Sequence, residues 1–357
     1  MKKLYSLIIL ALLTTVAFNA RAQSNDDDGF SQLIKSSPGD AAKLVSAYGM
    51  PLFKGFGVGL NSGWNNTAAT KKFLHFDLRI TAAVAQAPTS DKTFDVTKIG
   101  LSSHLTPVNS SDVIAPTFAG NKDASTPKMS INDDNGNQVS TFDLPKGVIQ
   151  YVPAPNIQLT VGLVKHTDLT IRTTPTIKIS DDAGSVGVFG FGLKHDIIQD
   201  FAKKGAIKPF DLAIAVNYNR LKYSKTLDVK PSNGTTAAPG QSSDFSNQHI
   251  DAVFSGVNIQ AIISKKLLFF TPFVSVGYQT AKTNLDVLGN YPIQSTVPGQ
   301  GSFYTTITDP VHINQNSISG LRGDLGFQLN LAIFRIYASV SQGGGYTSGN
   351  AGIGFGF

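Results

Sequence analysis

The sequence predicts an all-β fold: a transmembrane antiparallel β-barrel of about 12–14 strands with a short N-terminal helical plug. Three observations lead to this prediction, namely a secretory leader, long segments of alternating polarity, and an aromatic residue at the end of the chain. The composition agrees, because 34 glycines, 23 phenylalanines and a charged fraction of only 15% are typical of many strands joined by tight turns. The expected organisation is a signal peptide at 1–22, a plug segment at 23–54 and an outer-membrane β-barrel at 55–357.

The leader is recognised by its three parts. Lys2 and Lys3 precede an apolar run over 4–18, and Ala20-Arg21-Ala22 then fits a small-residue cleavage site. A membrane-spanning helix, the alternative, needs about 20 apolar residues. Removing 1–22 takes away three basic residues and lowers the formal charge from +6 to +3, so nucleic acid is not an expected partner. The chain has no cysteine, and therefore neither disulfides nor a lipid anchor on cysteine is expected.

Alternating polarity identifies the strands. In 155–164 the residues Ile157, Leu159 and Val161 share one face, and 321–331 has the same two-sided pattern. A soluble sandwich would show it too, but the long segments and the alternation of short turns with long connections favour a barrel with lipid outside. Strands are expected at 56–64, 72–85, 155–164, 167–179, 184–194, 209–221, 248–263, 266–282, 316–331, 333–342 and 346–357. At least one more is expected in 86–153, most plausibly at 94–105, because an even number is required.

The end of the chain has its own pattern. In "NAGIGFGF" the apolar residues Ala351, Ile353, Phe355 and Phe357 alternate with glycines. The last strand of a closed barrel pairs with the first, so its residues belong to the sheet. The pattern resembles the C-terminal signal of bacterial outer-membrane proteins. That resemblance implies recognition by the barrel-assembly machinery, a surrounding of outer-membrane lipid, and the outer membrane of a Gram-negative bacterium as the location.

An amphipathic helix is expected before the barrel. Ser37 can cap it, with Pro38 at its first position and Asp40 near the positive end of its dipole; Gly49 and Pro51 are expected to end it. Its apolar face must be buried, either inside the lumen as a plug, which is favoured, or against a partner. The predicted plug residues are Phe30, Leu33, Ile34, Leu44, Val45 and Tyr48.

Two stretches carry a family resemblance. Residues 37–64, "SPGDAAKLVSAYGMPLFKGFGVGLNSGW", and 190–196, "GFGLKHD", resemble an uncharacterised family of outer-membrane barrels common in Bacteroidota. That resemblance implies a barrel fold and no particular activity. An N-terminal helix before a barrel of this size is also distantly similar to the long-chain fatty-acid transporters, the FadL-like proteins. Those begin with an Asn-Pro-Ala motif, which 23–54 lacks.

Polar residues on the strands form the candidate site. Their alternation places them on the lumen face, where they either brace the wall and plug or line a solute path. Two prolines inside expected strands each remove a ladder hydrogen bond and are candidates for kinks, with a bulge or a strand end as the alternative. The lumen candidates are His75, Asp77, Arg79, Arg172, Lys178, Arg322, Asp324 and Gln328, and the kink candidates are Pro175 and Pro272. Trp64 is expected in an interfacial aromatic girdle.

No catalytic pattern is found. The six histidines are scattered, and the sequence has neither a Gly-x-Ser-x-Gly elbow nor a P-loop. The chain is therefore not expected to be an enzyme, and neither a cofactor nor a metal is expected. Two functions remain open: a plugged channel or transporter that passes small solutes, hydrophobic ones included, and a sealed structural or assembly barrel that recruits envelope or secretion partners. Length, plug and proline positions favour the first.

Overall fold

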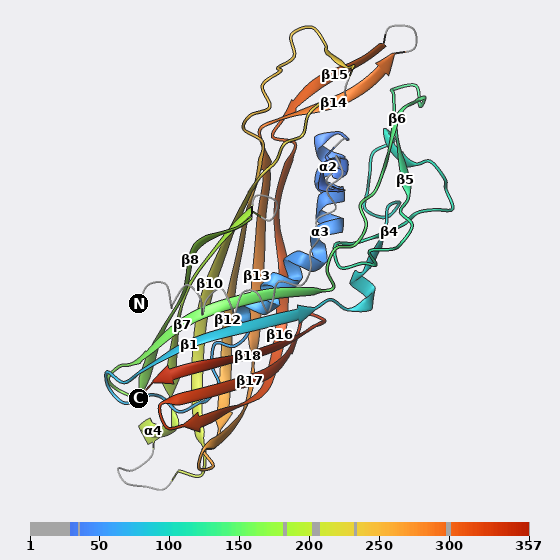
Figure 1. Ribbon diagram of the computed structural model, residues 1–357. Helices are drawn as coiled ribbons and strands as arrows, with labels where there is room; N and C mark the ends of the chain where they lie inside the picture. Colours follow the sequence, from blue (N-terminus) through green and yellow to red (C-terminus); the bar gives the residue numbers. More distant parts are fainter. Residues whose placement is uncertain are drawn as a thin grey trace.

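Ten antiparallel strands close into a barrel (Figure 1). The computed structural model describes residues 29–34, 36–180, 184–201, 208–231, 234–297 and 301–356; the expected signal peptide and Phe357 lie outside them. The all-β barrel prediction is confirmed. The order is β1-β18-β17-β16-β13-β12-β10-β9-β8-β7, with β1 pairing both β18 and β7. The strands are β1 (Phe76–Gln86), β7 (Tyr151–Gly162), β8 (Thr167–Ser180), β9 (Gly184–Asp196), β10 (Asp211–Thr226), β12 (His249–Ser264), β13 (Phe270–Leu288), β16 (Val311–Leu331), β17 (Phe334–Gly343) and β18 (Tyr346–Gly356).

The expected number of strands was wrong for two reasons. The stretch 56–64 is not a strand, because a helix extends to Asn61. The region 86–153 adds no strand to the barrel wall and instead folds as a separate unit beside it. That loop unit contains η1 (Thr89–Asp91), β2 (Thr93–Asp95), β3 (Leu105–Pro107), β4 (Ile114–Pro116), β5 (Lys128–Asn132) and β6 (Gln138–Asp143).

The two ends of the barrel differ. At one end, which we call the short-turn end, the strands are joined by tight turns and by a segment carrying α4 (Ile198–Phe201). At the other, the long-loop end, lie the loop unit and a three-stranded sheet of order β11-β15-β14 (Figure 1). The members of that sheet are β11 (Thr236–Ala237), β14 (Asn290–Val297) and β15 (Gly301–Thr308).

The wall is apolar outside and polar inside. On β12, Ile259 is 48% exposed, whereas its neighbour Asn258 is fully buried on the lumen side. The same alternation runs along β9, where Phe191 faces outward and Lys194 inward. This arrangement is the one expected for a barrel surrounded by lipid. Trp64 departs from the expectation, because it is buried in the lumen. In the described part of the chain, no helix has the length and apolarity to cross a membrane.

A bent helix enters the barrel from the long-loop end. A short helix, α2 (Gly29–Leu33), precedes α3 (Pro38–Asn61), whose N-cap is Ser37. Pro51 lies inside α3 rather than at its end, so the expected stop was wrong. A proline within a helix removes a backbone donor and favours a bend, which Figure 1 shows. The Tyr48 carbonyl near the bend accepts a hydrogen bond from the Phe118 N–H of the loop unit, at 2.9 Å.

The first half of α3 helps to form the main apolar core. This core, which we call the loop-end chamber, lies between the helix, the loop unit and the ends of the long strands. It contains five of the predicted plug residues, while the side chain of Phe30 lies outside the described structure. The plug residues in it are Leu33, Ile34, Leu44, Val45 and Tyr48, and their partners include Leu105, Met129, Phe142, Phe254, Leu285 and Ile313.

Candidate functional site

Two arginines of the wall hold the C-terminal end of α3. Arg172 of β8 donates to the Leu60 carbonyl at 2.7 Å and to the Ser62 carbonyl at 3.1 Å. Arg322 of β16 donates to the Val58 carbonyl at 3.3 Å and to the Ser62 hydroxyl at 2.9 Å. The last carbonyls of a helix have no partner within the helix and carry the negative end of its dipole, so cations stabilise them. We call this contact the arginine clamp.

Trp64 completes the arginine clamp. Its ring lies 3.9 Å from the Arg172 guanidinium carbon, within the range of a cation–π contact. Its indole N–H donates to the Leu60 carbonyl at 3.1 Å, and its own carbonyl accepts from Gln158 at 3.0 Å. Trp64 and Arg172 are both almost fully buried. The indole therefore orders the arginine and the helix end together.

Two glycines of β9 leave room for the ring of Trp64, and we call this position the seat of the ring. A Cβ atom at Gly190 would lie 3.0 Å from the ring of Trp64, and one at Gly192 would lie 3.3 Å from it. Gly190 is also the cross-strand neighbour of Arg172. The two stretches of the family resemblance, 37–64 and 190–196, thus meet at this seat. The sequence shows both stretches, but it does not show that they touch.

Glycines within α3 let the helix approach the wall. A Cβ atom at Gly55 would lie 2.5 Å from the side chain of Val152, and one at Gly57 would lie 2.6 Å from the Cβ of Ala281. Such distances are shorter than atomic contact permits, so no side chain fits at either position. A Cβ atom at Gly59 would lie 3.0 Å from the Cβ of Ala154 on β7, a tight approach that a shift of a few tenths of an ångström would accommodate. The glycines that make 56–64 look like a strand are the residues that let this helix fit.

Amides of the lumen bind the last helical residue. Asn219 donates to the Asn61 side-chain oxygen at 3.0 Å, and Asn258 donates to the Asn61 carbonyl at 3.1 Å. The Asn61 amide in turn donates to the Thr280 carbonyl at 3.2 Å. Sequence reasoning missed these residues. Their only signal was their place on the polar faces of strands.

The chain after the helix is also fixed inside the barrel. Lys194 donates to the Thr67 carbonyl at 3.0 Å and to the Ala69 carbonyl at 2.8 Å. The same ammonium lies 3.1 Å from the carboxylate of Asp168, which also accepts from the Lys71 N–H at 2.8 Å. The lumen is therefore occupied by ordered chain from α3 to the start of β1.

The structure brings six of the eight lumen candidates into local networks. Asp77 is paired with Arg79 at 2.7 Å and with Arg335, which the sequence did not suggest, at 2.6 Å. Arg322 of the clamp is paired with Asp324 at 2.7 Å. Of the other four, two also belong to these networks: Arg172 is part of the clamp, and Gln328 donates to Asn330 at 2.6 Å. His75 precedes β1, and Lys178 is exposed near the end of β8. These contacts favour the bracing alternative.

A second contact ties α3 to the loop unit. Lys54 of the helix lies 2.8 Å from the carboxylate of Asp91 in η1, and the Tyr346 hydroxyl donates to the same carboxylate at 2.9 Å. Partial burial acts to raise the pKa of Asp91, but the hydrogen bonds from Lys54 and Tyr346 outweigh it and hold that pKa below its ordinary value. We call this contact the Asp91 latch.

Acid is expected to weaken the Asp91 latch. A carboxyl whose pKa is lowered by folding contributes stability above its unfolded pKa, about 4, and loses it as the pH falls through the folded pKa. We therefore expect the protection of the amides around 50–56 and 88–92, measured against the intrinsic exchange rate at each pH, to fall below about pH 4. The Asp91→Asn variant should show the lower protection already at neutral pH. Equal exchange in both proteins at all pH values would contradict this role.

The barrel wall contains a seam without strand pairing. β7 and β8 are paired only from Gln158–Arg172 to Gly162–Asp168, whereas β7 pairs β1 along its whole length and β8 continues beside β9. Among the described residues, no pair joins 151–157 of β7 to 173–180 of β8. Figure 1 shows the two strands diverging toward the long-loop end. We call these two edges the β7–β8 seam.

Prolines stand where the seam would need backbone donors. The Gly162 N–H donates toward β1, to His75, and the Leu163 N–H donates toward β8, to Thr167. Because donors alternate along a strand and the β1–β7 register is unbroken, residues 153 and 155 face β8. Both are prolines, which have no N–H. The two prolines thus remove two of the donors that would otherwise extend this ladder on β7.

The two predicted kink residues behave differently. Pro175 lies on the opposite edge of the seam, within a shift of register between Thr174 and Ile177 of β8. Pro272 lies two residues after the start of β13 and pairs regularly with Phe327. The expected kink at Pro272 is therefore absent, because the residue stands at the strand end, where a missing donor distorts nothing.

Comparison with known proteins adds the family. The model of a family of unknown function, DUF6588, matches residues 1–357. The chain belongs to this family. No curated protein sequence matches it significantly. In the part of the chain that the structure describes, no three potential ligands gather as a metal site would require.

Solved structures share the barrel architecture. The attachment invasion locus protein Ail of Yersinia pestis is 10% identical, with 80% of this chain and 100% of that chain covered and a TM-score of 0.25. The outer membrane protease OmpT of Escherichia coli is 8% identical, with 83% and 100% covered and a TM-score of 0.30. A FadL homologue of Pseudomonas aeruginosa is 11% identical, with 82% and 91% covered and a TM-score of 0.24. These likenesses concern the fold alone.

Proposed function

We propose that this protein resides in the outer membrane of a Gram-negative bacterium as a plugged barrel that passes a small apolar solute. In this proposal α3 is the plug. The solute enters the loop-end chamber and leaves through the barrel wall at the β7–β8 seam. One observation carries the proposal: the wall is unpaired at this seam, and prolines stand at the positions where donors would otherwise extend the ladder.

The surroundings of the seam favour an apolar solute. On its outer margins, Tyr151 and Ile179 are exposed to the outside of the barrel, together with Pro155 and Pro175. The loop-end chamber is a packed core of buried aliphatic and aromatic side chains. The lumen toward the short-turn end is instead lined by amides and paired charges, and transfer of an apolar molecule into such a region is unfavourable. The apolar route therefore runs from the chamber to the seam.

The plug stands directly behind the seam. Gly55 and Gly59 of α3 touch Val152 and Ala154, two lumen-facing residues on the β7 edge. Movement of this half of the helix would change the space behind the seam first. The arginine clamp holds the end of the same half, so it sets how readily the helix moves.

A disulfide between plug and wall tests the proposal. A Cβ at Gly59 lies 3.0 Å from the Cβ of Ala154, somewhat below the usual separation of about 3.5–4.5 Å in disulfides, and the chain has no cysteine of its own. In cells of a Gram-negative host, uptake of the small apolar dye N-phenyl-1-naphthylamine should rise with the wild-type protein. It should fall in oxidised Gly59→Cys/Ala154→Cys and recover on reduction.

The single variants Gly59→Cys and Ala154→Cys are the matched controls. They carry the same substitutions but cannot form the intramolecular bond, so their uptake should not respond to reductant. Uptake by the oxidised double variant equal to that of both single variants would overturn the proposal.

A sealed barrel that recruits partners is the second candidate. The continuous occupation of the lumen by α3 and the chain up to β1 favours it. It predicts no dye uptake above the host background with any variant and stable co-purification of another envelope protein. Insertion by the barrel-assembly machinery is proposed for both candidates, because the closing strand β18 pairs with β1 from Asp77 to Gln86.

A further inference from the structure

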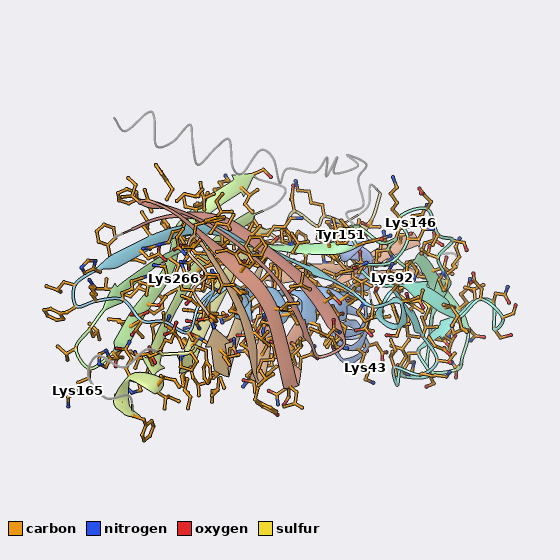
Figure 2. The ribbon with its side chains drawn as sticks, turned by 90° about the horizontal axis from the view of Figure 1, so that it is seen from below. Lys43, Lys92, Lys146, Tyr151, Lys165 and Lys266 are labelled. Carbon is orange, nitrogen blue, oxygen red and sulfur yellow. The ribbon has the colours of Figure 1, made fainter. Side chains whose placement is uncertain are left out.

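Lysines without ion-pair partners mark the short-turn end. We call the turns 72–74, 164–166, 265–269 and 332–334 the turn rim. Lys72, Lys165, Lys265 and Lys266 are exposed there, and none forms an ion pair within the part of the chain that the structure describes. Figure 2 shows Lys165 and Lys266 toward the end of the molecule opposite to Lys43, Lys92 and Lys146.

Some lysines at the long-loop end have carboxylate partners, whereas Lys122 and Lys146 are exposed and form no ion pair within the described residues. Three exposed ones lie beside carboxylates, and these pairs are Lys98–Asp95 at 3.3 Å, Lys128–Asp143 at 3.9 Å and Lys230–Asp228 at 2.8 Å. Near the turn rim, the exposed carboxylate of Asp200 is already paired with His195 at 2.7 Å. The charge of the turn rim is therefore not neutralised by neighbouring residues of the described chain.

Large apolar side chains stand next to the rim lysines. Leu74 and Leu268 are 66% and 87% exposed, and each lies two residues after a rim lysine, Lys72 and Lys266 respectively. Each lysine thus lies within about two residues of an exposed apolar side chain, which is less than about 7 Å along an extended chain. The other exposed apolar residues of the turn rim are Phe73, Val164, Leu267, Phe269, Ile333 and Phe334.

The backbone of these turns holds leucines in an unfavourable conformation. Leu74 has a φ of 61° and Leu268 a φ of 52°. Glycine adopts this left-handed region readily, whereas the backbone of a bulky residue is strained there. Hydrogen bonds fix both turns, from the Leu74 N–H to the Gly162 carbonyl at 2.8 Å and from the Leu267 N–H to the Phe270 carbonyl at 2.7 Å. Folding alone would favour glycine here, so the leucine side chains point to a contact outside the chain.

We propose that the turn rim binds a leaflet of anionic phospholipid. The lysine ammonium groups bind the lipid phosphates, and the neighbouring leucines and phenylalanines enter the boundary between head groups and acyl chains. The turn rim continues directly from the apolar outer face of the strands, which places its charges at head-group depth. An acidic soluble partner would match the lysines but not the apolar residues between them. This inference does not depend on the proposed transport.

The test measures lipid selectivity of the purified full chain. Native mass spectrometry in a neutral detergent would compare phosphatidylglycerol with phosphatidylcholine of the same acyl chains. The rim variant is K72Q/K165Q/K265Q/K266Q, and the matched control is K98Q/K122Q/K128Q/K230Q at the long-loop end. We expect the wild type and the control to prefer phosphatidylglycerol, and the rim variant to bind it about tenfold or more weakly.

A second variant distinguishes the loss of apolar contact with the lipid from a loss of protein stability. Leu268→Gly relieves the strained backbone, so the detergent-solubilised protein should be at least as stable as the wild type on heating. Its lipid binding should nevertheless weaken for both lipids. Equal binding of the two lipids by the wild type, or an equal loss in the rim and control variants, would overturn the proposal. Binding of polyglutamate without any preference for phosphatidylglycerol would also overturn it and indicate an acidic protein instead.

Discussion

Replacing Arg172 by alanine is expected to destabilise the protein by about 3–5 kcal/mol. The change would remove the arginine donor from the Ser62 carbonyl and from the Gln158 side-chain oxygen, and each buried acceptor left unpaired costs about 1–3 kcal/mol. The Leu60 carbonyl would keep only the donor from the Trp64 indole. The stacking partner of Trp64 would be lost as well. Thermal unfolding of the purified protein, followed by the shift in gel mobility of the folded barrel, measures the effect.

Two variants make this result specific. Arg220→Ala removes an arginine on the outward, exposed face of β10 and should change the free energy of unfolding by less than about 0.5 kcal/mol. Arg172→Met keeps much of the side-chain volume but offers no donor. If Arg172→Met is as stable as the wild type, then packing rather than the arginine clamp holds the helix end, and the role of the clamp is contradicted.

Replacing Gly57 by valine is expected to displace α3 from its position in the barrel lumen. Its Cβ alone would stand 2.6 Å from the Cβ of Ala281, and both belong to rigid elements, so the helix must move rather than a side chain. The barrel strands keep their own ladders and should still form. We therefore expect normal strand content by circular dichroism, together with rapid proteolysis of the N-terminal segment and rapid hydrogen exchange in α3.

Gly39 provides the matched control for this prediction. It lies in the first turn of the same helix, and a Cβ there would meet no atom within 4 Å. Gly39→Ala should therefore leave proteolysis unchanged and should stabilise the helix slightly, because alanine has the higher helix propensity. Protection of α3 that is equal in Gly57→Val and Gly39→Ala would show that the close approach of Gly57 does not determine the fit.

Alternating polarity was sufficient to locate most of the wall. The strands β1, β7 to β10, β12, β13 and β16 to β18 all overlap their expected positions, since a lipid-facing strand has to alternate. The same rule failed at 56–61. There Phe56, Val58 and Leu60 alternate with glycines as in a strand, and only the fit of those glycines against Val152 and Ala281 makes the helix favourable. That is a tertiary effect without a local signal.

The site could be predicted only in part. The arginine and aspartate residues of the lumen were found because they occupy polar faces, but Arg172 and Arg322 donate to backbone carbonyls of a helix that is distant in the sequence. The pattern of side chains in a sequence does not show which backbone carbonyl groups will accept hydrogen bonds. The seam could not be predicted from the sequence either. Pro175 was predicted as a kink, but the effect of Pro153 and Pro155 on the ladder follows only from the register, which shows that residues 153 and 155 face β8.

Single-channel conductance in a planar bilayer tests most directly whether the seated helix closes the barrel. The wild-type protein should be closed or open only rarely, because the lumen is occupied from α3 to β1, whereas folded Gly57→Val should carry a steady current. A steadily open wild-type pore would contradict closure by the helix, and so would a folded Gly57→Val protein that remains silent.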